Sequence, residues 1–147
     1  MTPPGTHIIA RGLAALMAPQ RILLVDDQPS ILHFLRCGLE EHWPACLVDV
    51  AGSAEQAQPL LASQTYDAIV TDYHLGDGDG VQLARLAKQY LPRVSIVLVS
   101  ASRHTLAAAE ADARRAGVGL LLAKPFDLSQ LVRALECPAS VTQCHSR

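Results

Sequence analysis

Five polar side chains stand at the ends of short apolar runs in this sequence, and their types suit phosphoryl chemistry. Asp26 and Asp27 close the first run, Asp72 closes another, and Ser100 and Lys124 close two later ones. If these runs are parallel strands, their carboxyl ends meet at one edge of the sheet, where open α/β sheets bind ligands. The sequence therefore predicts one site that combines three carboxylates, a hydroxyl and an ammonium group.

Each member of this set has a distinct chemical use. Neighbouring carboxylates repel one another unless a cation intervenes, and Mg²⁺ is the expected cation because it takes hard oxygen ligands and keeps several waters. We expect Asp26, Asp27 and Asp72 to bind it, with Asp72 also acting as the nucleophile that forms an aspartyl phosphate. Ser100 can donate a hydrogen bond to a phosphoryl oxygen, and Lys124 can balance the added charge.

The elements that must position these side chains alternate along the chain. Five apolar runs are separated by segments whose apolar residues recur at helical spacing. This alternation predicts an α/β fold with right-handed crossovers and a parallel sheet covered on both faces. The predicted strands are 21–27, 47–50, 66–71, 94–100 and 119–123, and the predicted helices are 29–42, 53–63, 81–91, 103–116 and 127–136.

Helix-end signals support these boundaries. Pro29 suits a first helical position, while Ser53 and Asp127 are expected N-caps and Gly117 is expected just after a helix end. The large aromatic residues of the first helical region, Phe34 and Trp43, are expected to pack into the core or against the helix end.

Length and composition favour one globular domain. The chain has 147 residues, of which 50% are hydrophobic and 18% are charged, so disorder is not expected. Its net charge of −2 gives no reason to expect nucleic acid or an anionic membrane as a partner. We expect a leader at 1–20 that is flexible or forms a short helix, a domain at 21–136, and a tail at 137–147.

The compartment is predicted to be the cytoplasm. The longest N-terminal apolar stretch, 8–17, is broken by Arg11 and is far short of the ~20 residues that span a membrane. No basic residue precedes it, which argues against a signal peptide. The four cysteines form no CxxC pair and are expected to be reduced thiols.

Several short motifs occur in order and carry a family resemblance. They are Leu-Val-Asp-Asp at 24–27, Val-Thr-Asp at 70–72, Val-Leu-Val-Ser-Ala at 97–101 and Ala-Lys-Pro-Phe at 123–126, with Gly80 eight residues after Asp72. On these residues the chain resembles the receiver domain of two-component response regulators, the CheY-like family, over about 21–136. The resemblance implies a doubly wound, flavodoxin-like fold with strand order 2-1-3-4-5.

The resemblance also implies roles and partners. Asp72 would be the phosphoacceptor, the main-chain carbonyl of His74 would join the three aspartates as a metal ligand, and the Lys124–Pro125 bond would be cis. A sensor histidine kinase or phosphotransfer protein would supply the phosphoryl group, and a downstream protein target would read the result. We expect a signalling acceptor that acts only in its own phosphorylation and dephosphorylation. No output or DNA-binding domain is expected after Glu136, so the receiver would be stand-alone or excised.

Two positions depart from the family pattern, and two others are expected to affect the lifetime of the phosphoryl group. Leu121 stands where receivers commonly have the aromatic ring that moves during switching, and Gly76 replaces a frequent proline. The missing ring leaves open how a signal reaches the surface next to it. His74 and Ser102 occupy positions that tend to set the phosphoryl lifetime.

Three other interpretations compete with the leading one. A phosphorylation-independent pseudo-receiver is the principal alternative, although the complete set of acids, hydroxyl and lysine argues against it. A phosphatase of the haloacid-dehalogenase type requires DxD after the first strand, whereas this chain has adjacent Asp26 and Asp27. The Asp-Gly-Asp-Gly segment at 77–80 hints at a calcium loop, but Lys88 stands where the required glutamate is expected, so a polar turn is favoured.

Overall fold

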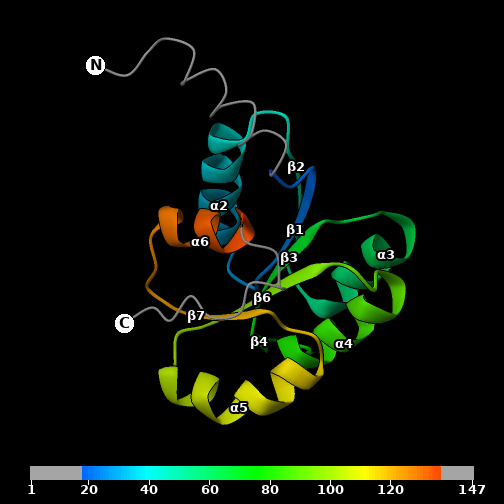
Figure 1. Ribbon diagram of the computed structural model, residues 1–147, viewed down its shortest axis with the longest axis vertical. Helices are drawn as coiled ribbons and strands as arrows, with labels where there is room; N and C mark the ends of the chain where they lie inside the picture. Colours follow the sequence, from blue (N-terminus) through cyan, green and yellow to red (C-terminus); the bar gives the residue numbers. More distant parts are fainter. Residues whose placement is uncertain (1–17, 137–147) are drawn as a thin grey trace.

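The computed structural model describes residues 18–136, which form a five-stranded parallel sheet between two layers of helices (Figure 1). The sheet order is β2-β1-β3-β6-β7, which confirms the predicted order 2-1-3-4-5. Its strands are β1 (Arg21–Val25), β2 (Leu47–Ala51), β3 (Ala68–Asp72), β6 (Ser95–Ser100) and β7 (Leu120–Ala123). The helices are α2 (Pro29–His42), α3 (Ala54–Ser63), α4 (Gly80–Tyr90), α5 (Arg103–Arg115) and α6 (Leu128–Glu136).

Each face of the sheet has its own hydrophobic core. Helices α2 and α6 cover one face, and α3, α4 and α5 cover the other, as Figure 1 shows. All five residues of the central strand β3 are buried, which explains why the sequence there reads as a continuous apolar run rather than an alternating one. Burial on both sides fixes β3, and thereby fixes the position of Asp72 at its end.

The helix ends largely follow the predicted caps. The Ser53 hydroxyl accepts a hydrogen bond from the N–H of Gln56 at 3.1 Å, and α5 ends before Gly117, whose φ is +98°. At α6 the side chain of Gln130 accepts a hydrogen bond from the N–H of Asp127, and the Asp127 carboxylate accepts one from the hydroxyl of Ser129.

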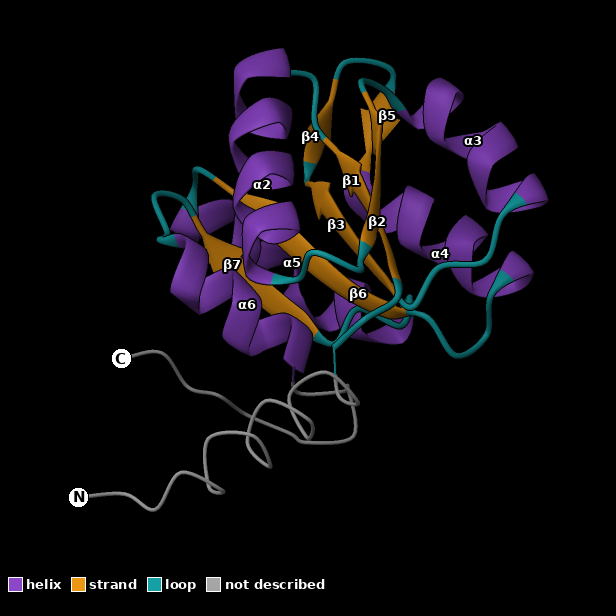
Figure 2. Cartoon of the chain, turned by 90° about the horizontal axis from the view of Figure 1, so that it is seen from above, coloured by secondary structure: helices purple, strands orange, loops and turns teal. Residues whose placement is uncertain are grey.

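Three predictions about strand and loop structure need correction. The first strand ends at Val25 rather than at residue 27, so the two acids follow the strand. The third strand begins at Ala68 rather than Tyr66, because Asp67 turns there to accept hydrogen bonds from two main-chain N–H groups at the start of β1. The turn expected after Asp72 contains a short antiparallel hairpin, formed by β4 (His74–Leu75) and β5 (Gly78–Asp79) and visible in Figure 2.

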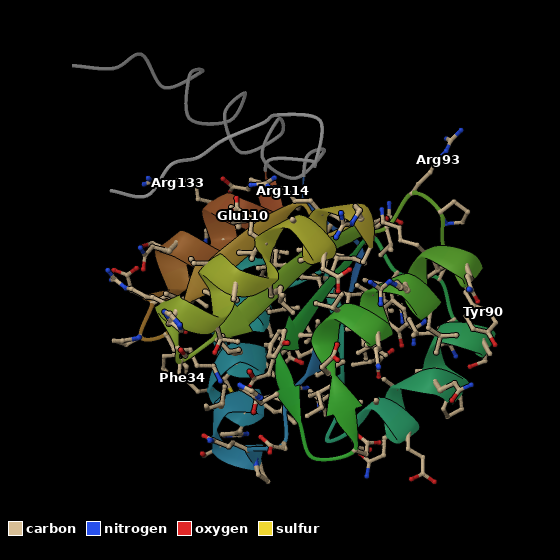
Figure 3. The ribbon with its side chains drawn as sticks, turned by 90° about the horizontal axis from the view of Figure 1, so that it is seen from below. Phe34, Tyr90, Arg93, Glu110, Arg114 and Arg133 are labelled. Carbon is tan, nitrogen blue, oxygen red and sulfur yellow. The ribbon has the colours of Figure 1, made fainter. Side chains whose placement is uncertain are left out.

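The prediction for Phe34 was wrong. Trp43 is buried as expected, but the Phe34 side chain is 63% exposed and projects from α2 into solvent in Figure 3. The core of that helix is supplied by Leu32, Leu35 and Leu39, and Phe34 lies off this stripe.

The remaining predictions concern the chain ends, the thiols and the membrane. Most of the predicted leader, 1–17, and the predicted tail at 137–147 lie outside the described residues. Within 18–136 both cysteines, Cys37 and Cys46, are free thiols, and burial raises the pKa of the Cys46 thiol to about 11. No helix in the described part of the chain has the length and hydropathy required to cross a bilayer.

Candidate functional site

Three aspartates converge where β1 and β3 end. These two strands are neighbours in parallel register, with Val25 opposite Thr71, so the residues that follow lie side by side. Carboxylate oxygens of Asp26, Asp27 and Asp72 all lie within 4.8 Å of one another. Asp26 and Asp72 are buried, whereas Asp27 is exposed at the mouth of the group. The predicted convergence is confirmed, and metal binding by these acids stays a prediction.

Lys124 reaches this acidic group from the end of β7. Its Nζ donates hydrogen bonds to Oδ2 of Asp26 at 3.0 Å and to Oδ2 of Asp72 at 3.1 Å. Burial by itself lowers the pKa of Lys124, but hydrogen bonds and charge interactions with the two aspartates outweigh it and raise the pKa above the ordinary value. The lysine is therefore a fixed positive charge shared by two buried carboxylates.

The other oxygens of the same two carboxylates face the main chain. Oδ1 of Asp26 accepts from the N–H of Gln28 at 2.9 Å, and Oδ1 of Asp72 accepts from the N–H of His74 at 3.3 Å. Each buried carboxylate is thus oriented by one main-chain donor and one ammonium donor. These contacts fix the orientation of the Asp72 carboxylate at the end of β3.

Ser100 lies on the neighbouring strand, where β6 ends beside β7. Its side chain is fully buried, and its Oγ accepts from the N–H of Ser102 at 3.1 Å. Its carbonyl accepts from the N–H of Lys124 at 2.8 Å, which ties the end of β6 to the start of the Lys124 segment. The Lys124–Pro125 peptide bond that follows is cis, as the resemblance implied.

The two residues that are expected to set the phosphoryl lifetime differ in how far their side chains are held by other groups. The Ser102 hydroxyl is engaged as the N-cap of α5, where it accepts from the N–H of Thr105 at 3.1 Å. His74 is exposed, and its ring forms a T-shaped pair with that of Tyr73, with 4.8 Å between ring centroids. Leu121, at the position of the missing aromatic ring, is half-buried against the core beneath α5.

Gly80 packs directly against the main chain of Asp72. It is the first residue of α4, and a Cβ placed on it would collide with the main-chain carbonyl oxygen of Asp72 and lie 2.6 Å from Cδ1 of Leu98. Its N–H also donates to the carbonyl of Tyr73 at 2.8 Å. Only glycine fits this contact, so α4 begins directly on the backbone of the strand that carries Asp72.

The Asp-Gly-Asp-Gly segment has a structural use that sequence reasoning missed. Asp77 accepts hydrogen bonds from the N–H groups of Ala54 and Glu55, and Asp79 accepts one from the N–H of Gln82. Each aspartate therefore caps a helix, α3 and α4 respectively, which accounts for both acids without calcium. The cap at Asp79 was detectable from its place just before an apolar helical pattern, but nothing local indicated the contact of Asp77 with α3.

Comparison with known proteins assigns the family. Residues 22–136 match the family model described as the response regulator receiver domain. The chain belongs to this family. The receiver domain is a signalling domain of two-component systems, so the fold and the broad function predicted from the motifs are both confirmed.

Several curated relatives of this receiver are much longer than the chain itself. It is 35% identical over 127 residues to the alginate biosynthesis transcriptional regulatory protein AlgB of Pseudomonas putida, covering 86% of this chain and 28% of that protein. It is 32% identical over 117 residues to the response regulator protein PilR of Pseudomonas aeruginosa, covering 78% and 25%. The chain thus spans about a quarter of the length of these two relatives.

Solved receivers have the same fold. A response regulator from Burkholderia pseudomallei, described with a phosphorylated aspartic acid, calcium ion and citrate, superposes with a TM-score of 0.74 at 26% identity. That match covers 82% of this chain and 69% of the other. The beryllofluoride-activated NtrC4 receiver domain dimer gives a TM-score of 0.70 at 26% identity, covering 80% and 93%.

Proposed function

We propose that this receiver accepts a phosphoryl group on Asp72 in a two-component or phosphorelay system. The observation that carries the proposal is the Lys124 ammonium, which bridges the buried carboxylates of Asp26 and Asp72 beside Asp27. If the acids were only a solvated surface cluster, they would need no buried cation. If Lys124 were only part of a structural ion pair, one carboxylate would be enough. A shared ammonium next to a strand-end aspartate suits a group that will gain further negative charge.

The transfer step is a nucleophilic displacement at phosphorus. A phosphorylated histidine of a sensor kinase or phosphotransfer protein is the proposed donor. An oxygen of the Asp72 carboxylate forms the new P–O bond, the P–N bond breaks, and its electron pair stays on the donor imidazole. Lys124 then balances charge on the acyl phosphate, and the hydroxyl of Ser100 donates to one of its oxygens.

The acidic group fits a magnesium ion. Three hard carboxylate donors whose oxygens lie within 4.8 Å of one another are the ligand type that Mg²⁺ prefers. Asp26, Asp27, Asp72 and the main-chain carbonyl of His74 would hold it, and when bound it would neutralise charge on the phosphoryl oxygens. Asp27 is exposed, so the site is open to the waters that Mg²⁺ usually keeps.

The proposed output is a change in protein binding. Phosphorylation would shift an existing equilibrium between two conformations, and a downstream protein would bind one of them more tightly. The names of the relatives AlgB and PilR, a transcriptional regulatory protein and a response regulator, support a regulatory role. We propose that the protein works in the cytoplasm as a signalling acceptor without catalytic action on other substrates.

Labelling with a small phosphodonor tests this proposal. Wild type, Asp72→Asn and the exposed-site control Asp112→Asn are incubated with acetyl phosphate, with and without Mg²⁺, and weighed by intact-mass spectrometry. One added phosphoryl group is expected on wild type and on the control, only with Mg²⁺, and none on Asp72→Asn. An unmodified wild type would overturn the proposal and favour the pseudo-receiver.

A further inference from the structure

The hairpin β4–β5 connects the phosphoacceptor strand to the start of another helix. It leaves the sheet immediately after Asp72, and Figure 2 shows its outer end beside α3. At the inner end, the N–H of His74 donates to the Asp72 carboxylate, and Leu75 is buried in the core. A main-chain donor to the acceptor carboxylate therefore belongs to the hairpin.

The outer end of the hairpin is held by Asp77. Its two carboxylate oxygens accept from the N–H of Ala54 at 3.0 Å and of Glu55 at 2.9 Å, 23 and 22 residues away in sequence. The glycines on either side have little support of their own. A Cβ on Gly76 would meet nothing within 4 Å, and one on Gly78 would meet only the side chain of Gln82.

The start of α3 is thus capped by two residues with different consequences. Ser53, the helix's own N-cap, accepts from Gln56, whereas Asp77 accepts from the two N–H groups before it. Both satisfy donors at the same helix end. Only Asp77 also fixes the hairpin that carries His74.

We propose that Asp77 is a positioning residue for phosphoryl acceptance, because its attachment to α3 holds the His74 backbone against Asp72 and the expected metal. The inference rests on the proposed function of Asp72. The hydrogen bonds from Glu55 and Ala54 lower the pKa of the Asp77 carboxyl, so the attachment is complete at neutral pH. A loosened hairpin would leave the acceptor and its acids in place but move one main-chain ligand and one main-chain donor.

Two alanine variants at one helix end separate positioning from stability. Asp77→Ala and Ser53→Ala each remove a cap from α3, so both are expected to lower the stability of the protein. Hydrogen exchange of the main-chain amides at 74–79 is then measured without metal, and Mg²⁺ affinity is measured by calorimetry. Asp77→Ala is expected to speed exchange across the hairpin and to weaken Mg²⁺ binding about tenfold, as losses of supporting contacts around metal ligands do. Ser53→Ala is expected to change neither.

Phosphorylation by acetyl phosphate over a range of Mg²⁺ concentrations completes the test. We expect Asp77→Ala to need about ten times more Mg²⁺ for half-maximal labelling but to reach the wild-type extent. Asp77→Asn keeps one acceptor oxygen and should fall between wild type and Asp77→Ala, which provides a measurement if the alanine variant does not fold.

Three results would overturn the inference. One is wild-type exchange and Mg²⁺ affinity in both Asp77 variants, and another is equal weakening in Ser53→Ala and Asp77→Ala, which would indicate helix stability alone. The third is faster hairpin exchange with unchanged Mg²⁺ affinity. A wild type that takes up no phosphoryl group would refute the proposed function instead, and exchange and calorimetry would still decide the role of Asp77.

Discussion

Two groups of aspartates, one at the ends of β1 and β3 and one within the β4–β5 hairpin, are held in different ways. Asp26 and Asp72 are buried, and each accepts from one main-chain N–H and from the shared ammonium group of Lys124. Asp77 and Asp79 lie outside the core and accept from fixed main-chain N–H groups at two helix starts. The first pair can change its cation partner, whereas the second pair can only keep or lose its donors.

The comparison shows that the role of an aspartate is indicated by the groups that bind its carboxylate, and not by the residue type alone. A buried carboxylate held by a side-chain cation retains a strong attraction for a further cation. A carboxylate that caps a helix already accepts hydrogen bonds from main-chain N–H groups. When such a carboxylate belongs to a glycine-rich loop, it attaches that loop to the helix. The same residue type therefore serves chemistry at Asp72 and attachment at Asp77.

Removing the shared cation should give the largest effect. Without Mg²⁺, Lys124→Ala is expected to lower the free energy of unfolding by about 3 kcal/mol, because two buried carboxylates lose their counter-charge. Mg²⁺ should restore a large part of this loss, measured by urea denaturation. The control Arg85→Ala breaks an exposed ion pair with Asp112 and should cost under about 1 kcal/mol with or without Mg²⁺. A Lys124→Ala loss that Mg²⁺ leaves unchanged would contradict the idea that the buried pair can exchange cations.

The stabilisation by Lys124 and the stabilisation by Asp77 should be lost at opposite ends of the pH scale. The pKa of Lys124 is raised on folding, so its stabilisation is complete below the unfolded pKa of about 10.4 and is lost as pH rises through the higher folded value. The pKa of Asp77 is lowered, so its stabilisation is complete above the unfolded value of about 3.9 and is lost as pH falls through the lower folded value.

Urea denaturation of wild type, Lys124→Ala and Asp77→Ala across pH checks this separation. In the alkaline range the difference in the free energy of unfolding between wild type and Lys124→Ala should narrow. The corresponding difference for Asp77→Ala should stay constant there. In the acid range the gap for Asp77→Ala should close. A gap for Asp77→Ala that persisted at the acid limit would show that the side chain stabilises the fold by something other than its charge.

The smallest effect is expected at Asp79. Asparagine caps helices about as well as aspartate, so Asp79→Asn should change the free energy of unfolding by less than about 0.5 kcal/mol, while Asp79→Ala should lose about 1 kcal/mol. Thermal unfolding of the two variants beside wild type measures both. Equal losses would mean that charge rather than acceptor geometry matters at this cap, which would remove the contrast with Asp72.

Much of the fold was predictable because each clue was local. Alternating strand and helix patterns predicted the α/β class, and the family motifs implied the sheet order. The strand-end side chains of Asp26, Asp72 and Lys124 converge because parallel strands end at one edge. The exposure of Phe34 was also readable, since it lies off the stripe of leucines that α2 buries.

The missed features depend on contacts between distant segments. Tyr66 looks like strand sequence but is buried outside β3, where its hydroxyl donates to Asp49 at 2.7 Å. Asp77 meets α3 only because a loop with several glycines bends toward a helix that lies earlier in the sequence. Neither partner is marked by spacing or composition, so hydrophobic periodicity could not reveal either contact.

The double ion pair of Lys124 also places the site in the order of chain synthesis. The lysine stands 98 residues beyond Asp26 and 52 beyond Asp72, so the two acids are made long before their cation. A nascent chain that ends before β7 holds the carboxylates without the ammonium group, and closing such long loops delays the contact during folding as well. The complete set requires the ends of β1, β3 and β7 to be in place together, so its presence reports that these three strands have formed.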